Sequence, residues 1–188
     1  MKVLCEVSVR HVHLSTKDLE SLFGKGAKLE EVRGLSQPHQ FVSAQKVDIV
    51  GPKRTIEGVS VLGPVRAETQ VEVSRTDCFT LGIKDVPVRQ SGFLEGTPGI
   101  VLKNGDKSIA LPYGVIVMQR HVHLDPATAS ANKIKDGQLV DLVFGGERGG
   151  VLSNTVVRIN KDFAPAVHID SDEGNAMAAS NEVTLRVK

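Results

Sequence analysis

The chain of 188 residues contains no tryptophan, one tyrosine and only 4% aromatic residues in total. Its hydrophobic core must therefore consist mainly of valine, isoleucine, leucine and alanine, and a hydrophobic content of 40% is enough for a sizeable core. No run of apolar residues approaches the roughly 20 residues of a membrane span. The first residues turn polar too soon for a signal peptide. We therefore expect no membrane partner.

Strong charge is also lacking, since the net charge is only +1. This balance gives no electrostatic basis for binding nucleic acid or a charged membrane surface. The two cysteines, Cys5 and Cys78, form no C-x-x-C pair, and two isolated cysteines fit a reducing compartment. We therefore predict a cytoplasmic protein without a nucleic-acid partner.

Short apolar runs rich in valine recur along the whole chain, with glycine and proline between them. Such runs favour strands, and roughly ten short strands at this spacing are typical of barrels or sandwiches. Helices are expected to be few and short, each beginning at a capping residue. They are predicted in STKDLESLFG (15–24), DPATASANK (125–133) and DSDEGNAMAAS (170–180).

The pentapeptide RHVHL occurs twice, at Arg10–Leu14 and at Arg120–Leu124, and holds four of the six histidines. Each copy follows an apolar run and precedes a capped short helix, a glycine and another apolar run. An internal duplication is the economical explanation. We therefore predict a mainly β protein made of two tandem similar β-barrels with short helices.

The spacing within each copy predicts a metal site. Residues two apart in a strand share a face, so His11 and His13 point the same way, as do His121 and His123. If each preceding strand runs on unbroken, its core face ends in two imidazoles. Buried imidazoles need partners, and two neighbours cannot both be cationic at low cost. Neutral imidazole is a favoured ligand for zinc, which would resolve both problems.

Further candidates lie outside the repeated motif. His168 ends an apolar run just before a capped helix, whereas His39 is interpreted as a loop residue. Along VRAETQVEVSRTD, Glu68 is expected on a half-exposed strand, and Glu72, between two valines, is the better inward carboxylate. Arg66 is a candidate anion site because guanidinium offers a fork to phosphate. Six residues of straight strand span about 20 Å, so Arg66 and Glu72 share a site only if the chain bends.

These motifs resemble the phosphate propanoyltransferase family, the phosphotransacylases of propanediol degradation and their relatives. The motifs that carry the resemblance, in family order from about residue 7 to 179, are VRHVHLS, LSQPHQF, VDIVGPK, VLGPVRAETQVEVSRTD, LGI, VRQSGFLEGTPGI, GVIVMQRHVHL and HIDSDEGNA. The resemblance implies two β-barrels, with the first strand crossing over to the C-terminal half. Residues 1–10 with 119–188 would form one barrel and residues 11–118 the other. It also implies a homodimer.

The resemblance further implies two zinc ions per subunit, with site residues carried over by motif. His11 and His13 would hold one ion that keeps an open position. The second ion would be held by His121, His123, His168 and Glu72. Arg66 would bind phosphate and act in catalysis.

The sequence departs from the family pattern in two places. Val9 stands where a small polar residue is expected, and His39 stands where glycine is expected. Members packaged into microcompartment shells carry an N-terminal extension that this chain lacks, so packaging is not expected.

The implied reaction moves a propanoyl or acetyl group reversibly between CoA, a substrate or product, and inorganic phosphate, giving acyl phosphate. No G-x-S-x-G elbow is present, and neither cysteine has a partner base in the sequence. Direct transfer in a ternary complex is therefore favoured over a covalent acyl-enzyme. The alternatives are a dinuclear metallohydrolase or thioesterase, a cupin-type oxygenase, and a non-catalytic tandem barrel that zinc only staples together.

Overall fold

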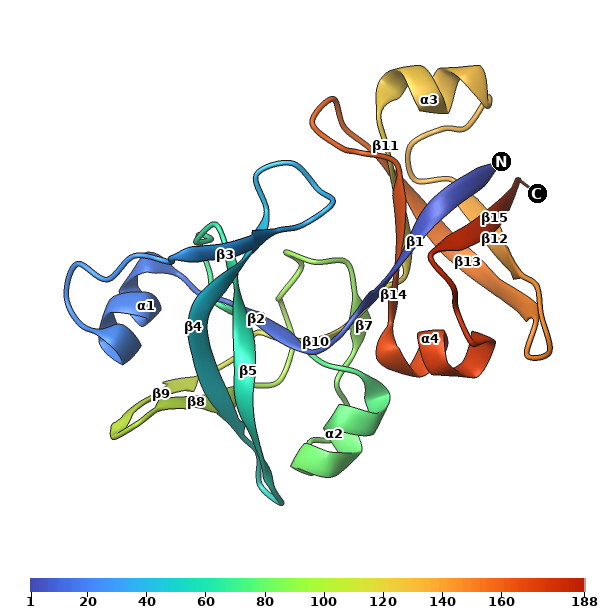
Figure 1. The fold of residues 1–188 in the computed structure, drawn as a ribbon. Coiled ribbons are helices and arrows are strands. Elements are labelled where there is room, and N and C mark those ends of the chain that lie inside the picture. The colour runs from blue at the N-terminus through green and yellow to red at the C-terminus, as the bar shows by residue number, and fades with distance from the viewer. Residues whose placement is uncertain (188) are drawn as a thin grey trace. The chain divides into compact units, whose positions relative to one another are not determined.

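The computed structural model describes residues 1–187 and is mainly β, with four short helices among these residues (Figure 1). The mainly β fold with short helices is thus confirmed. The strands are β1 (Lys2–Ser8), β2 (His11–His13), β3 (Glu31–Gly34), β4 (Phe41–Val50), β5 (Thr55–Gly63), β6 (Gln70–Glu72), β7 (Val88–Arg89), β8 (Ile100–Asn104), β9 (Lys107–Leu111), β10 (Val115–Met118), β11 (His121–Leu124), β12 (Leu139–Phe144), β13 (Gly150–Ile159), β14 (Ala166–Asp170) and β15 (Glu182–Val187). The helices are α1 (Thr16–Phe23), α2 (Arg75–Leu81), α3 (Pro126–Ala131) and α4 (Ser171–Met177).

The chain divides into two compact units. The barrel unit consists of Met1–Val9, Ser36–Pro38 and the chain from Gln119 onward, and the sheet unit consists of Arg10–Leu35 and His39–Met118. The domains expected from the sequence, 1–10 with 119–188 and 11–118, stay a prediction. The units differ from those ranges chiefly in Ser36–Pro38, which lie with the barrel unit.

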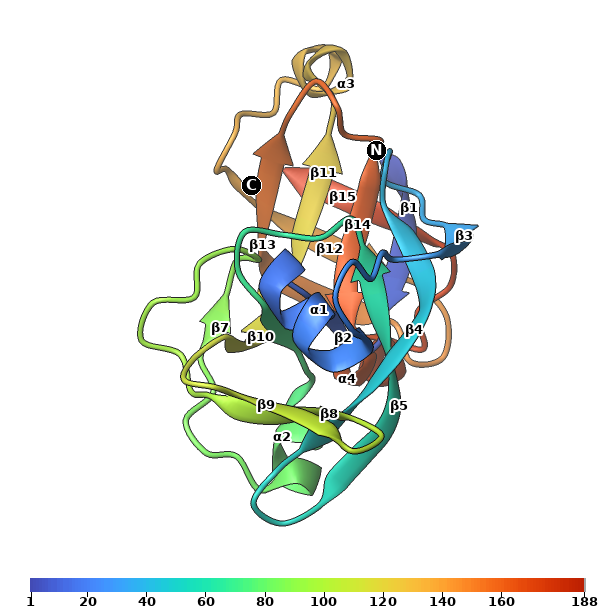
Figure 2. The same ribbon diagram turned by 90° about the vertical axis from the view of Figure 1, so that its left-hand side faces the viewer.

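The barrel unit closes six strands in the order β1-β14-β11-β13-β12-β15 (Figure 2). The first strand, β1, pairs in parallel with β14 and antiparallel with β15, so the start of the chain completes a barrel whose other strands all follow residue 120. The interior is aliphatic, as the scarcity of aromatic residues requires. Val122, Leu142 and Ile169 are completely buried there.

The sheet unit holds the other nine strands in one sheet. Their order is β7-β10-β6-β2-β5-β4-β8-β9, and β3 pairs with β4. Among the described strands this sheet ends at β7 and β9, so its pairings leave it open, in contrast to the closed barrel. Leu19 and Leu22 of α1 are buried in its core with Val12 and Ile49.

The strand before each RHVHL copy does not run on unbroken, so the condition under which its core face would end in two imidazoles is not met. β1 ends at Ser8 and β10 ends at Met118, and in both places the chain then enters the other unit and starts a new strand at the first histidine. The core residue of β2 is Val12, which is fully buried. Because side chains alternate along a strand, the imidazoles of His11 and His13 lie on the opposite face from Val12.

Three predicted helices are present and one helix was missed. Ser15, Asp125 and Asp170 cap α1, α3 and α4 as expected. The alternation over residues 65–74 predicts one strand, but only Gln70–Glu72 are a strand, and α2 begins directly after Ser74. None of the described helices combines the length and the apolar character needed to cross a membrane.

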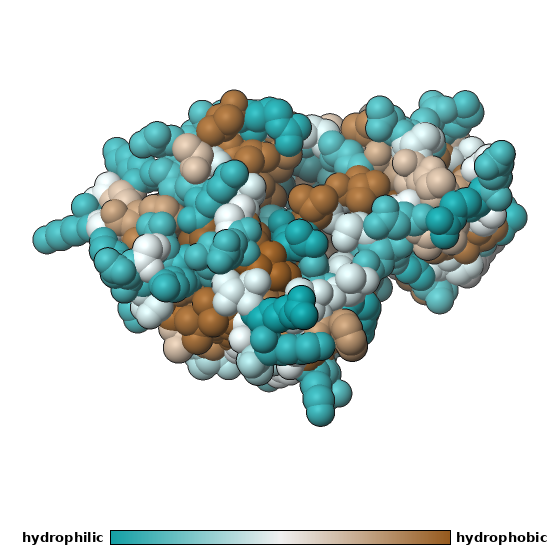
Figure 3. Space-filling view, turned by 60° about the horizontal axis from the view of Figure 1, so that its bottom comes forward, coloured by the Kyte–Doolittle hydropathy of each residue, from teal (hydrophilic) through white to brown (hydrophobic). Residues whose placement is uncertain are grey.

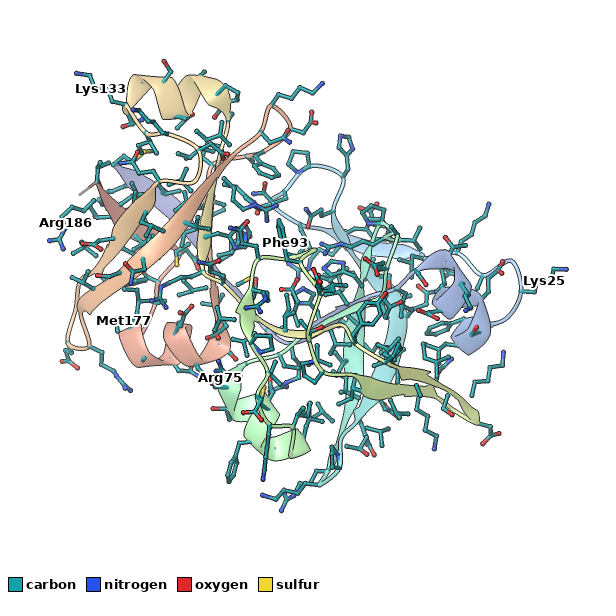
Figure 4. All side chains as sticks on the ribbon, turned by 180° about the vertical axis from the view of Figure 1, so that it is seen from behind. Lys25, Arg75, Phe93, Lys133, Met177 and Arg186 are labelled. Atoms are coloured by element: carbon teal, nitrogen blue, oxygen red, sulfur yellow. The ribbon has the colours of Figure 1, made fainter. Side chains whose placement is uncertain are left out.

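Some large hydrophobic side chains remain at the surface. The face drawn in Figure 3 shows hydrophobic patches separated by hydrophilic side chains. Phe93, labelled in Figure 4, is exposed in the loop between β7 and β8, and Phe79 of α2 is exposed beneath the ammonium group of Lys53.

Candidate active site

Three candidate metal ligands meet in the sheet unit where β2 lies beside β6. We call His11, His13 and Glu72 the sheet group. His11 is the register partner of Glu72, and its Nε2 lies 3.4 Å from Glu72 Oε2. Nε2 of His13 lies 3.9 Å from Glu72 Oε1. All three side chains are buried, and their ligand atoms lie within 4.8 Å of one another.

Arg66 reaches the sheet group through Ser91. Nη1 of Arg66 donates a hydrogen bond to Ser91 Oγ at 2.8 Å, and Ser91 Oγ donates to Glu72 Oε1 at 2.9 Å. The amide of Gln70 donates to both Ser91 and Glu72. β6 begins only at Gln70, so the chain bends after Arg66, and the condition for Arg66 and Glu72 to share a site is met.

Burial and neighbouring charges set the protonation states of the sheet group. Burial lowers the pKa of His13 well below its ordinary value, and His11 and Arg66 lower it further. Burial alone would raise the pKa of Glu72, but His11, His13 and Arg66 outweigh it and hold this pKa below its usual range. At neutral pH, His13 is therefore a neutral imidazole and Glu72 is a carboxylate, the forms that bind metal.

A second cluster of three histidines lies in the barrel unit. We call His121, His123 and His168 the barrel group, and their ligand atoms also lie within 4.8 Å of one another. His121 on β11 is the register partner of His168 on β14, and their ring centroids are 5.1 Å apart. Nδ1 of His121 lies 2.9 Å from the carbonyl oxygen of Gln119, which can only accept. Nδ1 therefore carries the proton, and Nε2 carries the lone pair.

The residues of both groups fit a divalent metal ion. Both ring nitrogens of His123 are buried without a hydrogen-bond partner among residues 1–187. Burial, with His121, His168 and Arg158 nearby, lowers the pKa of His123 to about 2, so this ring is neutral at pH 7. Unpaired buried nitrogens cost free energy, which a bound cation would recover. Three imidazoles in one group, and two imidazoles with a carboxylate in the other, are donor sets suited to zinc.

The two groups are built in the same way. β2 has one parallel neighbour, β5, and one antiparallel neighbour, β6, just as β11 has β13 and β14. The first histidine of each motif faces the third group member across the antiparallel pair, so Glu72 and His168 are equivalent. The structure therefore brings Glu72 together with His11 and His13. Its assignment to the ion of the barrel group, which the resemblance implies, stays a prediction.

Two polar residues of the site were not identified from the sequence. Gln70 shares the face of Glu72 two residues away, which was a usable signal. Ser91 lies in a loop, and only the fold brings it beside Arg66 and Glu72. Glu68 is exposed but lies before β6 and not on the expected strand, and its carboxylate accepts a hydrogen bond from the Tyr113 hydroxyl.

His39, the second departure from the family pattern, lies in an exposed turn, as predicted for a loop residue. Its φ of 64° is in the left-handed region. Glycine adopts this conformation at no steric cost, which explains why glycine is expected there.

Comparisons with known proteins show which family this chain resembles. A family model described as phosphate propanoyltransferase matches residues 4–180. A protein named phosphate propanoyltransferase from Thermotoga maritima is 48% identical over 175 residues, which cover 93% of this chain and 83% of that protein. One of the same name from Rhodopseudomonas palustris is 44% identical over 186 residues, covering 99% and 82%. Another, from Listeria monocytogenes, is 47% identical over 171 residues, covering 91% and 80%.

Proposed function

Since the chain belongs to the phosphate propanoyltransferase family and is an acyltransferase, we propose that it transfers a propanoyl or acetyl group reversibly between CoA and inorganic phosphate. The observation that carries this proposal is the network from Arg66 through Ser91 to Glu72. It places a guanidinium, which can hold phosphate by two parallel hydrogen bonds, beside a group that fits a metal ion.

The residues of the network have different roles in binding phosphate. Arg66 binds and orients the phosphate, while Ser91 and Gln70 keep Arg66 and Glu72 apart and fixed. An unprotonated phosphate oxygen then attacks the carbonyl carbon of the thioester. The new C–O bond forms as the C–S bond breaks, and CoA leaves as a thiolate that takes up a proton from water. Holding the two reactants together supplies most of the rate enhancement, because it removes the entropic cost of bringing them together.

Two zinc ions per subunit are part of the proposal. His11 and His13 would hold one ion, and His121, His123 and His168 the other. Glu72 would complete the coordination of the first ion, because it lies in the sheet unit beside His11 and His13. The resemblance implies instead that it completes the coordination of the second ion. When bound, zinc would stabilise the negative charge that develops on the carbonyl oxygen and would accept the sulfur of CoA as a soft ligand.

Direct transfer in a ternary complex is favoured by the state of the cysteines. Cys5 is buried in the barrel core, and burial, with Glu6 nearby, raises the pKa of its thiol to about 11. Such a thiol is almost never a thiolate at neutral pH. Cys78 is buried in the core of the sheet unit. Acyl label retained on the denatured protein, or ping-pong kinetics, would contradict direct transfer.

The decisive experiment measures thiol release by the zinc-loaded protein. Propanoyl-CoA and acetyl-CoA are each supplied with and without inorganic phosphate. We expect release that requires phosphate and is lost in Arg66→Ala. It should be retained in the matched control Arg33→Ala, which removes an exposed arginine of β3. The same assay ranks the two acyl groups.

Other outcomes of this assay identify the alternatives. Equal release without phosphate would indicate a thioesterase and would remove the role of Arg66. No release despite bound zinc would indicate a non-catalytic protein that zinc staples together. A homodimer and a cytoplasmic location, which the resemblance and the cysteine usage imply, stay predictions.

A further inference from the structure

The barrel group has a carboxylate behind it that belongs to neither histidine pair. Glu6 on β1 is the parallel register partner of His168 on β14. Its Oε2 lies 3.6 Å from Nδ1 of His168, and the same oxygen accepts a hydrogen bond from the hydroxyl of Ser36. At this separation the two groups are neighbours within ion-pair distance and are not hydrogen-bonded. Ser36 thus holds the Glu6 carboxylate on the Nδ1 side of His168.

The residue after Ser36 supports a second member of the barrel group. Gln37 is only 3% exposed, and its amide is bound twice to the backbone of Ala164. Nε2 donates to the Ala164 carbonyl at 2.9 Å, and the Ala164 N–H donates to Oε1 at 3.3 Å. Phe163, next in the chain, stacks on the ring of His123 with 3.9 Å between centroids. We call Ser36–Pro38, which lie with the barrel unit, the strap.

The internal duplication gives Glu6 a counterpart for comparison. The equivalent position in the other half is Ile116, which is the parallel register partner of Glu72. In the sheet group the carboxylate is a member and a buried isoleucine lies behind it. In the barrel group all members are histidines, and the carboxylate of Glu6 lies on the neighbouring strand β1, beside His168. Each group therefore has one carboxylate: in the sheet group it is the third member, and in the barrel group it lies next to the third member.

We propose that Glu6 and the strap position His168 and His123 for binding a divalent metal ion. Glu6 is a positioning residue: its carboxylate accepts the Nδ1 proton of His168 and so leaves the lone pair on Nε2. Carboxylates behind ligand histidines fix the tautomer and the ring orientation in this way and make the ring a stronger ligand. Gln37 fixes Ala164 and thereby the Phe163 ring against His123. The inference rests on the metal binding in the proposed function.

The test measures zinc affinity in the full chain carrying His11→Ala and His13→Ala, so that the barrel group remains. Competition with a chelator gives the dissociation constant for zinc. We expect Glu6→Ala to weaken binding by roughly 10- to 100-fold, and Glu6→Gln, which keeps an acceptor oxygen, by less. Gln37→Ala should also weaken it. The matched control is Glu182→Ala, an exposed glutamate of the same barrel that pairs with Lys2. An unchanged dissociation constant in Glu6→Ala would overturn the proposal.

A second readout needs no metal. The ring ¹⁵N chemical shifts of His168, assigned by their loss in His168→Gln, report which nitrogen carries the proton. We expect the Nδ1–H form in the unmodified chain and a shift toward the Nε2–H form in Glu6→Ala. If the background variant binds no zinc, the metal part of the proposed function is wrong, and the ring shifts alone decide the role of Glu6. If the tautomer is the same with and without Glu6, the inference is wrong even where zinc binds.

Discussion

Arg10 donates a hydrogen bond from Nε to the carboxylate of Asp77, 2.7 Å away. Asp77 also accepts from the backbone of Ser74 in the capping box of α2. The equivalent Arg120 binds Glu173, which closes the capping box of α4. In both halves, the arginine before the histidines is tied to the helix that follows the third group member. This explains why the repeated motif includes its arginine as well as its histidines.

The first prediction concerns this arginine anchor. Arg10→Ala should lower the free energy of unfolding by about 1–3 kcal/mol, because the Asp77 side chain is 2% exposed and loses its charged partner. Urea unfolding followed by circular dichroism measures the change. Lys2→Ala is the control, since it breaks an exposed ion pair with Glu182 and should lower the free energy of unfolding much less. Equal small losses in both variants would contradict the anchor.

The second prediction assigns Glu72 to one of the two ions. Its place beside His11 predicts that Glu72→Gln weakens zinc binding by the sheet group. We therefore expect roughly 10-fold or greater weakening in a background that lacks His121 and His123. In a background that lacks His11 and His13, Glu72→Gln should have no effect. Zinc competition titrations in both backgrounds measure this, and the reverse pattern would support the assignment that the resemblance implies.

Much of the candidate site could be predicted from residue types and spacing alone. The H-x-H spacing, repeated in two copies, predicts the two histidine pairs, and the position of Glu72 between two valines predicts an inward carboxylate. In the structure, Glu72 joins the pair His11 and His13 in one group. Ser91 could not be found in this way, because its role depends on a loop folding back onto Arg66. The separation of Ser91 from Arg66 along the sequence does not indicate that the two side chains meet.

The fold was predictable at the level of strands and less so at their ends. Period-two alternation continues from Val3 through His13, because the backbone is extended on both sides of the break at Val9 and Arg10. A pattern of alternation records extended backbone and cannot record a change of sheet. α2 was missed for a similar reason. The alternation up to Ser74 indicates a strand, although the S-x-x-D sequence that begins at Ser74 is typical of the start of a helix.

The third prediction tests the link between Arg66 and Glu72. Ser91→Ala removes the hydroxyl that accepts from Arg66 and donates to Glu72. We expect kcat/KM for phosphate to fall by roughly tenfold, the equivalent of one hydrogen bond of about 1.4 kcal/mol. Steady-state thiol release at varied phosphate measures it. Ser91→Thr keeps the hydroxyl and should restore most of the loss, whereas an equal loss in both variants would assign Ser91 a packing role.

The fourth prediction is a loss of stability of the metal-free protein at mildly acidic pH. The pKa values of His13 and His123 in the folded chain lie below their ordinary value, that of His123 at about 2. Between the folded and unfolded values, only the unfolded chain binds protons at these rings. The free energy of unfolding should therefore fall as the pH drops below about 6.5, by up to about 1.4 kcal/mol per pH unit for each histidine.

Glu72 adds to this loss only at lower pH. Because its folded pKa is depressed, its contribution is present above the ordinary carboxyl pKa and disappears as the pH falls through the folded value. Urea unfolding with a chelator at pH 5.5, 6.5 and 7.5 therefore isolates the histidines. His123→Gln should reduce the slope in this range. A slope that is the same in this variant would show that His123 is not buried as a neutral ring.

The fifth prediction concerns the effect of His39 on the free energy of unfolding. At its φ of 64° a side chain costs roughly 1–2 kcal/mol, because Cβ crowds the following carbonyl oxygen. His39→Gly removes that strain, while the greater freedom of glycine in the unfolded chain takes back about 0.4–1 kcal/mol. We therefore expect a net gain of up to about 1 kcal/mol in the free energy of unfolding, measured in urea. Lys133→Gly, at φ 55°, should behave alike.

Lys135→Gly serves as the control, because Lys135 is not among the residues with positive φ, and it should lose about 0.4–1 kcal/mol through the greater freedom of glycine in the unfolded chain. A loss in His39→Gly as large as in this control would mean that the imidazole makes a contact worth more than the strain of its backbone. In that case zinc affinity should be measured in His39→Gly too, because Ser36 and Gln37 lie in the same turn region and hold the barrel group.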